Sequence, residues 1–276
     1  MLMRCLYVDM DGTLLGPNAS LLTGADGGFS TLGVRALEAC ARAGAEVVIY
    51  SGRRQGSVFD AARLIGSSAY IFELGCGLVV DDELEWLTDG LVPTEEGGSI
   101  YDQIEASGAP AVLLDRFAGT LEYHTPWSIG REVSHLFRGT VDLDEVASVL
   151  ETAGLDWLRL VDNGVILAAS EQMTGLPVIH AYHLIPAGAS KARGVARHMQ
   201  ARGYAPADCI AAGDSREDME AASVVGAFWL VANALQRDLT LESEVAGRAG
   251  VRIASESYGA GVYEAVVTTL AERGQR

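Results

Sequence analysis

The sequence is poor in basic residues and has no long apolar run. Its 20 Lys and Arg residues stand against 37 Asp and Glu residues, a net charge of −17. Proteins that bind nucleic acid or an anionic membrane depend on clustered Lys and Arg, so we expect neither partner. No apolar stretch approaches the ~18 residues that span a bilayer, and Asp9 already ends the first apolar run, so no signal peptide is expected. A soluble, cytoplasmic protein is the resulting expectation.

Cysteine is also scarce, and it is not arranged in motifs. Cys5, Cys40, Cys76 and Cys209 lie far apart, mostly within apolar stretches, and none forms a C-x-x-C pair. Buried free thiols in a reducing compartment are therefore expected, whereas a zinc site or a disulfide framework is not.

The composition that remains is that of a globular protein. The 276 residues are 49% hydrophobic and 21% charged, which is enough apolar material for a substantial core. This length fits either one large domain or two moderate ones. We find no internal repeat and no low-complexity tract.

Both ends of the chain show an alternation of strands and helices. Short apolar runs predict buried strands, and capped periodic segments predict helices between them. This rhythm is typical of a parallel sheet covered on both faces, with right-handed crossovers. The expected strands are 4–8, 46–50, 69–72, 208–212 and 228–231, and the expected helices are 31–44, 57–65, 191–201, a helix from about 216, and 262–272.

From residue 84 to residue 183 the pattern changes to α+β. Strands are expected at 111–114, 121–124 and 157–160, and helices at 99–106 and 143–152. The Asn-Gly dipeptide within 161–166 is a hairpin signal. We therefore predict the α/β class: a Rossmann-like, doubly wound parallel sheet formed by 1–83 plus 184–276, with an inserted α+β domain of 84–183.

Four short motifs follow the strands of this expected core or open the next helix. In the first, Asp9 and Asp11 stand two residues apart at the end of a strand, and Gly12 permits the sharp turn that follows. The carboxyl edge of an open parallel sheet is where such folds bind ligands, so the motifs indicate one shared site. They are DMDGT at 9–13, SGRR at 51–54, SKARG at 190–194 and GDSREDME at 213–220.

Taken one at a time, the motifs have ordinary structural explanations. Acid pairs are common in solvated loops, and Ser-Gly after a strand is usually a turn. A lone Lys191 is most often a surface residue, although the helix macrodipole disfavours a cation there. Asp214 and Asp218 would suit the cap and first turn of the helix that begins near residue 216. It is their joint occurrence along one sheet edge that favours a functional site.

The set has a consistent chemistry. Asp9, Asp11 and Asp214 offer hard oxygen ligands, and Mg²⁺ prefers sparse carboxylate sites that water and phosphate complete. A hydroxyl and a glycine backbone N–H at the turn of 51–54 form an anion cradle, and Lys191 supplies positive charge. The pattern therefore predicts a site for a phosphoryl group in spite of the negative net charge.

With these motifs in this order, the sequence resembles the haloacid dehalogenase (HAD) superfamily of Mg²⁺-dependent phosphotransferases. DMDGTLL, YSGRR, SKARGVA and GDSREDME are similar to its first, second, third and fourth motifs. The insertion between the second and third motifs resembles the C2 cap of type IIB members, the subgroup of the Cof-type, sucrose-phosphate and mannosyl-3-phosphoglycerate phosphatases. The motifs cover the two core segments, and the cap is identified by its position and expected pattern.

The resemblance implies catalytic and metal-binding roles for the four acids. Asp9 would be the nucleophile that forms an aspartyl-phosphate. Asp11 would protonate the leaving oxygen and then activate water. Mg²⁺ would be held by the carboxylates of Asp9 and Asp214 and the backbone carbonyl of Asp11, with Asp218 as a supporting ligand or a neighbour of the ligands.

The resemblance also implies how the phosphoryl group is bound. Ser51 would donate a hydrogen bond to it, with Gly52 and Arg53 beside it in the second motif. Lys191 would neutralise charge on the phosphoryl group and on Asp9. Asn233, in the segment VANA, matches an Asn-Ala pair often found after the next strand, and it would touch the phosphate or organise the loop.

Two features depart from the family pattern. Many relatives have Asn before the second acid of the fourth motif, whereas Glu217 precedes Asp218 here. This adds a negative charge near the metal and puts the arrangement around the ligands in question. The third strand also ends in FELGCGL, where many relatives carry Asn-Gly after the Glu, and this substitution would alter the loop that enters the cap.

The favoured function is Mg²⁺-dependent hydrolysis of a small phosphorylated metabolite, a sugar phosphate or a phosphoglycerate-type ester. One alternative is a phosphosugar mutase of the same fold, although GDSREDME lacks the longer Gly-rich form associated with those mutases. Another is a non-catalytic binding protein, which the complete set of side chains disfavours. Nothing specifies the oligomeric state. The candidate contacts to the leaving group, each with a solvated face as its alternative, are Arg131, Arg138, Arg159, His180 and His183.

Overall fold

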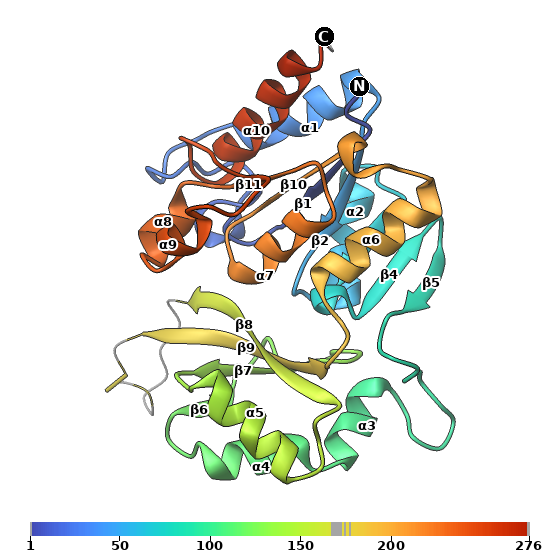
Figure 1. Cartoon of the computed structure of the whole chain (residues 1–276), viewed down its shortest axis with the longest axis vertical. Coiled ribbons are helices and arrows are strands. Elements are labelled where there is room, and N and C mark those ends of the chain that lie inside the picture. Colours follow the sequence, from blue (N-terminus) through green and yellow to red (C-terminus); the bar gives the residue numbers. More distant parts are fainter. Residues whose placement is uncertain (1, 167–172, 174, 177, 275–276) are drawn as a thin grey trace. The chain divides into compact units, whose positions relative to one another are not determined.

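The computed structural model describes residues 2–166, 173, 175–176 and 178–274 (Figure 1). The chain divides into two compact units, one made of Met1–Glu85 and Ser190–Arg276 and the other of Trp86–Ala189. The sequence prediction ended the insertion at residue 183, which lies inside the last strand of the second unit. That strand stays with its own sheet, so the second unit runs on to Ala189.

The first unit contains an eight-stranded sheet in the order β12-β11-β10-β1-β2-β3-β4-β5. The strands from β12 to β3 pair in parallel, and β4 turns back antiparallel to β3. The strands are β1 (Cys5–Val8), β2 (Glu46–Tyr50), β3 (Ala69–Phe72), β4 (Gly77–Val80), β5 (Glu83–Trp86), β10 (Cys209–Gly213), β11 (Ala227–Leu230) and β12 (Val251–Ile253).

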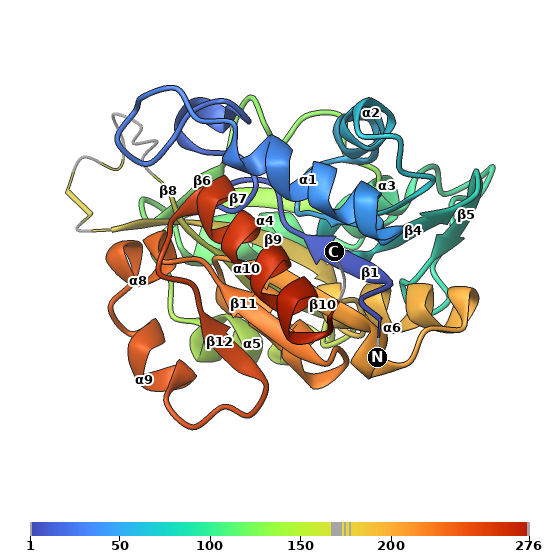
Figure 2. The same cartoon turned by 90° about the horizontal axis from the view of Figure 1, so that it is seen from above.

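Helices and 3₁₀ turns connect these strands. Of these, α1 and α10 lie side by side in both views (Figures 1 and 2). The helices of the first unit are α1 (Leu32–Ala43), α2 (Gln55–Leu64), α6 (Lys191–Arg202), α7 (Arg216–Met219), α8 (Asn233–Arg237), α9 (Leu241–Val245) and α10 (Tyr258–Glu272). The 3₁₀ turns are η1 (Pro17–Ala19), η2 (Glu73–Gly75), η4 (Pro206–Asp208) and η5 (Glu220–Ser223).

Strand β1 shows why both faces of this sheet are covered. Its four residues are all buried, and alternate side chains point to opposite faces. Leu6 and Val8 join the apolar core that α1 and α10 complete, while the Tyr7 hydroxyl lies 2.8 Å from Nδ1 of His198 in α6. The sheet is therefore covered on both faces, and the predicted α/β class with a mainly parallel sheet is confirmed.

The second unit is an α+β module with its own antiparallel sheet, in the order β6-β7-β9-β8. A capping box at Ser99 and the Asp142 side chain begin two of its helices, because both side chains accept from backbone N–H groups of the first turn. Its elements are α3 (Ile100–Ala106), α4 (Ala109–Arg116), β6 (Leu121–Tyr123), β7 (His135–Gly139), α5 (Leu143–Thr152), β8 (Leu158–Ile166) and β9 (Ile179–Pro186).

Two expectations for this unit were wrong. Residues 111–114 lie in α4 and not in a strand. A short apolar run alone does not distinguish a helix from a strand, and Pro110 in the first turn is typical of the start of a helix. The Asn-Gly dipeptide at 163–164 does not turn a hairpin. Gly164 has φ +99°, and the register shift between Asp162 and Val165 makes this point an irregularity inside the long strand β8.

Within the described residues, none of the helices combines the length and the apolar character needed to cross a bilayer.

Candidate active site

Asp9 follows β1 at the carboxyl edge of the first unit's sheet. Its N–H continues the ladder to the carbonyl of Ala212, and its own carbonyl accepts from Leu14 N, which closes the loop of the first motif. Gly12 in that loop has φ +87°, and a Cβ there would lie 2.2 Å from an Asp214 carboxylate oxygen. Only glycine fits this turn, so the first motif presses closely against the fourth.

Lys191 is the first residue of α6, after Ser190, whose side chain accepts from Arg193 N. Its ammonium group is buried and donates to Asp9 Oδ1 at 2.8 Å and to Asp218 Oδ1 at 2.6 Å. Burial alone would lower the pKa of Lys191, but the charges of Asp218 and Asp9 outweigh it and raise the pKa above its usual value. Lys191 is therefore a fixed cation between two acids, and it is the only lysine in the sequence.

Asp218 organises the fourth motif. Its Oδ2 accepts from the N–H groups of Asp214 and Ser215 at 3.1 and 3.0 Å and from the Ser215 hydroxyl at 2.7 Å. Ser215 Oγ in turn accepts from Asp218 N, which makes a capping box at the start of α7. Asp218 is thus the third residue of the helix and completes the capping box, and through its other oxygen it is a partner of Lys191.

The Asp214 carboxylate faces the first motif and the rim of the site. Its Oδ1 accepts from Thr13 Oγ1 at 2.9 Å, and its Oδ2 accepts from Arg237 at 3.1 Å. Burial, followed by the charge of Asp218, raises the pKa of Asp214 to about 7. Burial likewise raises the pKa of Asp9 well above its usual range, against the opposing effect of Lys191. The surroundings thus disfavour the charged forms of both carboxyl groups when no cation is bound.

A bound cation would stabilise these charged forms, so the question is whether the side chains can hold a metal ion. One carboxylate oxygen from each of Asp9, Asp214 and Asp218 lies within 4.8 Å of the others. Hard oxygen donors with uncompensated negative charge are what a small divalent cation such as Mg²⁺ requires. The residues present therefore fit the expected cation. Asp11 adds no carboxylate to this group, because its side chain is bound elsewhere.

Asp11 and Arg53 form an ion pair at the same edge. The guanidinium donates from Nε and Nη2 to the two carboxylate oxygens at 2.6 and 2.5 Å, while the side chains remain 31% and 52% exposed for Arg53 and Asp11. This bidentate geometry orients Asp11 at the mouth of the site. Arg53, expected beside the phosphate, here binds the predicted acid–base residue.

The remaining residues of the second motif surround the end of β2. Ser51 is buried, its hydroxyl accepts from Arg53 N at 3.2 Å, and Gly52 is buried beside it. Because β1 and β2 pair with Val8 opposite Ile49, Ser51 and Asp9 leave neighbouring strands at the same edge.

Asn233 and Glu217 act on the backbone around this edge. The Asn233 amide donates to Gly12 O and accepts from Tyr258 N, each at 2.8 Å, which favours loop organisation over contact with phosphate. Glu217 is buried and accepts from Lys191 N at 3.0 Å. Its negative charge therefore lies at the N-terminus of α6, where the helix dipole stabilises it.

Three residues of the site were not among those predicted from the sequence. Thr13 and Arg237 bind Asp214, and the Tyr50 ring lies 5.0 Å from the Lys191 ammonium while its hydroxyl donates to Ala212 O. Thr13 and Tyr50 directly adjoin or lie in quoted motifs, so position alone could have drawn attention to them. Arg237 had no such signal, because it lies beyond the last motif.

The five basic side chains considered for the leaving group all have partners inside the second unit. Arg138 pairs with Glu122, and Arg159 donates to Ala189 O. His180 faces Asp162 at 3.0 Å, whereas Arg131 and His183 both approach the Ser134 hydroxyl. These contacts give each side chain a structural role in this unit.

Comparisons with known proteins agree with the motif pattern. The chain is 26% identical to a phosphoglycolate phosphatase of Methanoculleus marisnigri, over 96% of each chain. Its fold matches the sucrose-phosphatase of Synechocystis sp. PCC6803 with a TM-score of 0.67 and 15% identity, over 98% of both chains. It also matches a sugar phosphatase of HAD subclass IIB with a TM-score of 0.60 and 14% identity, over 98% of this chain and 99% of that one. No protein-family model matches the chain.

The curated relative and two of the similar solved structures bear the names of phosphatases, and both likenesses extend over nearly the whole chain. The motif resemblance is therefore confirmed. The chain is similar in fold to haloacid dehalogenase phosphatases of subclass IIB and in sequence to a curated phosphatase, and these comparisons support the enzyme class of the phosphoric monoester hydrolases.

Proposed function

We propose that the protein is a Mg²⁺-dependent phosphatase that hydrolyses a small phosphorylated metabolite through an aspartyl-phosphate on Asp9. The observation that carries the proposal is the buried Asp9–Lys191–Asp218 arrangement, with Lys191 Nζ 2.8 Å from Asp9 Oδ1 and 2.6 Å from Asp218 Oδ1. A buried ion pair adds little to the stability of a fold, because apolar side chains of similar size often stabilise a core equally well. Its presence at the ligand-binding edge of the sheet supports a chemical role.

Asp9, Asp214 and Asp218 are the side chains that would hold Mg²⁺, since they offer three oxygens within 4.8 Å of one another. The bound ion would supply positive charge for the phosphoryl oxygens in a site that already carries an excess of acids. Lys191 complements it on the protein side, because its ammonium stays charged between Asp9 and Asp218.

In the first step we infer that Asp9 Oδ attacks the phosphorus atom, while the bond from phosphorus to the leaving oxygen breaks. Asp11, which is more exposed and is bound by Arg53, would donate a proton to that oxygen. In the second step water attacks the aspartyl-phosphate and gives a proton to Asp11, which releases inorganic phosphate and restores the Asp9 carboxylate. Bidentate binding by Arg53 keeps the Asp11 carboxylate oriented between the two steps.

The names of the relatives suggest which substrates to test first. Phosphoglycolate is the substrate in the name of the Methanoculleus marisnigri relative, and a sucrose phosphate ester is implied by the name of the Synechocystis enzyme. We propose small phosphate monoesters of hydroxy acids, with phosphoglycolate first, because the relative that carries this name is the more similar in sequence.

The experiment compares phosphate release by the wild type with that of Asp9→Asn and a matched surface control, Asp60→Asn in α2, at saturating Mg²⁺. Aryl phosphate and phosphoglycolate serve as substrates. We expect Asp9→Asn to lower kcat by at least about 10³-fold, because it removes the nucleophile, and Asp60→Asn to leave kcat unchanged. Phosphate release by Asp9→Asn at the wild-type rate would contradict the assignment. Activity on the aryl ester alone would retain the phosphatase and reject the proposed substrate class.

A further inference from the structure

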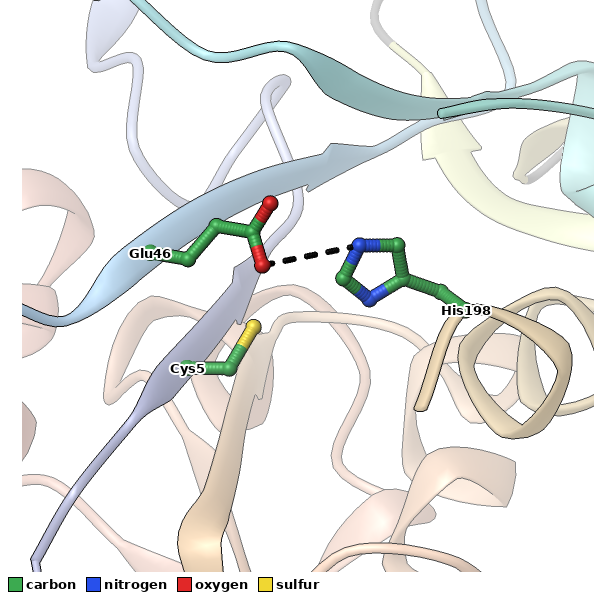
Figure 3. A group of neighbouring side chains, drawn as sticks. All are labelled: Cys5, Glu46 and His198. Carbon is green, nitrogen blue, oxygen red and sulfur yellow. Dashed lines mark ion pairs between the residues drawn. The ribbon is translucent and has the colours of Figure 1, made fainter. Parts of the chain in front are cut away.

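A second cluster of potential ligands lies at the opposite, amino edge of the parallel sheet. Cys5 begins β1, Glu46 begins β2 in register with it, and His198 lies in α6. Figure 3 shows the three side chains pointing toward one another, and one ligand atom from each lies within 4.8 Å of the others. This cluster takes no part in the proposed hydrolysis.

The cluster is largely closed to solvent. Cys5 and His198 are fully buried, and the Glu46 side chain is 18% exposed. Burial of ionisable groups is costly unless they are paired or bind a metal ion. The amino edge therefore needs a structural explanation of its own.

The imidazole of His198 is satisfied on one side only. Its Nδ1 lies 2.8 Å from the Tyr7 hydroxyl. Its Nε2 is buried with no hydrogen-bond partner in the described structure, and the nearest acid oxygen, Glu46 Oε2, is 3.6 Å away. An unsatisfied buried polar atom is costly, and this one faces Glu46 Oε2 across the 3.6 Å ion pair that Figure 3 draws as a dashed line.

We propose that Cys5, Glu46 and His198 bind a zinc ion at this edge. A thiolate, an imidazole nitrogen and a carboxylate oxygen form a ligand set that zinc accepts. Bond lengths of about 2.0 Å to nitrogen and oxygen at a tetrahedral angle separate the two atoms by roughly 3.3 Å, close to the 3.6 Å between His198 Nε2 and Glu46 Oε2. Binding releases the proton of the Cys5 thiol and leaves a site without net charge.

The surrounding residues support this assignment. A metal-binding histidine usually engages its second ring nitrogen with a polar group, and Tyr7 provides that contact. Glu46 is oriented by Arg202, which donates to Oε1, and by Tyr204, which donates to Oε2 at 2.9 Å.

The position of the site suggests what zinc would do. It would join β1, β2 and α6 at one end, and the same three elements carry Asp9, Ser51 and Lys191 at or beyond their other ends. A metal here would therefore stabilise the framework of the catalytic edge without touching substrate. Residues 5, 46 and 198 are too far apart in sequence to form a spaced motif, which is why the cysteine pattern gave no sign of it.

The test is a titration of the metal-free, reduced full-length protein with Co²⁺ in the presence of saturating Mg²⁺, which covers the carboxylates of the catalytic edge. Cobalt bound to a thiolate gives a near-ultraviolet charge-transfer band, and carboxylates alone do not. We expect this band to saturate at one equivalent and Zn²⁺ to abolish it. Cys5→Ser should lose the band, whereas Cys40→Ser, the matched variant of another buried free thiol, should retain it.

Two outcomes overturn the proposal: no band in the wild type, or a band that Cys5→Ser retains. His198→Gln provides a second variant that leaves the buried Cys5 thiol in place, and circular dichroism checks that both variants are folded. A folded His198→Gln protein that binds Co²⁺ as tightly as the wild type would also reject the site. The hydrolysis assay with Asp9→Asn is independent of this result, so either proposal can fail alone.

Discussion

The two edges of the parallel sheet carry polar clusters with different charge balance. At the carboxyl edge, Lys191 donates to Asp9 and Asp218, Asp214 accepts from Arg237, and burial raises the pKa of Asp9 and of Asp214. In the cluster at the amino edge, Glu46 has a lowered pKa, because its contacts with His198, Tyr204 and Arg202 outweigh its burial. The carboxyl edge is suited to change charge during a reaction, whereas the amino edge, with its proposed metal ion, is suited to hold the fold together.

The largest effect should come from removing the buried cation, with Lys191→Met. Breaking a buried ion pair typically costs about 3–5 kcal/mol, because the acids are left uncompensated. We expect a loss of this order in the free energy of unfolding, measured by denaturant in the absence of metal, and no measurable phosphate release. Mg²⁺ should recover much of the stability but not the activity.

Lys191→Arg is the control for charge. It keeps a cation at the site but replaces a compact ammonium by a planar guanidinium. We expect most of the stability to be retained and the activity to be lost. Equal destabilisation by both substitutions would mean that shape, and not charge, determines the role of Lys191.

The second prediction concerns pH and the metal-free protein. The pKa of Asp214 is raised from 3.8 to about 7 in the folded state, so folding favours its protonated form. The stability that this form contributes is complete below pH 3.8 and is lost as the pH rises through about 7. We therefore expect the melting temperature to fall over this window without metal, and Mg²⁺ to reduce the fall. A thermal-shift series from pH 5 to pH 8 measures it, and an unchanged slope in Asp214→Asn would contradict the assignment.

Much of the carboxyl edge could be predicted from the sequence, because each motif follows or opens a regular element. The predicted ranges 46–50 and 69–72 coincide with β2 and β3, and the predicted helix from residue 191 begins at the first residue of α6. The apolar runs and the Ser190 cap fix these elements locally. Asp9 and Asp214 each follow a strand, and because β1 and β10 pair in parallel, both residues lie at the same edge of the sheet.

What could not be predicted depends on contacts between distant residues. The Arg53–Asp11 pair, the Arg237–Asp214 contact and the cluster of Cys5, Glu46 and His198 each join separate segments, and no spacing rule covers them. Short edge strands such as β5 and β12 also have little periodicity of their own, since pairing with a neighbour defines them. Lys191 as the only lysine was a signal available in the sequence itself.

The third prediction separates charge from hydrogen bonding at the N-terminus of α6. Glu217 accepts from Lys191 N at 3.0 Å, and Glu217→Gln retains an acceptor while Glu217→Ala does not. We expect Glu217→Ala to cost about 1 kcal/mol, as for loss of a helix cap, and to lower kcat by about tenfold because Lys191 is less well positioned. Glu217→Gln should keep most of both. Enhanced Mg²⁺ affinity in Glu217→Gln would instead show that this carboxylate competes for the metal.

The smallest effect is expected at the amino edge, with Tyr204→Phe. The Tyr204 hydroxyl donates to Glu46 Oε2 at 2.9 Å. When this hydroxyl is removed, Glu46 keeps its contacts with Arg202. The loss should therefore be that of one ordinary hydrogen bond, about 0.5–1.5 kcal/mol in the free energy of unfolding. Because this edge touches no substrate, kcat and KM should remain at wild-type values in the phosphate-release assay. A change in kcat without a change in stability would show that the two edges are coupled through β2 and α6, and that the amino edge does more than support the fold.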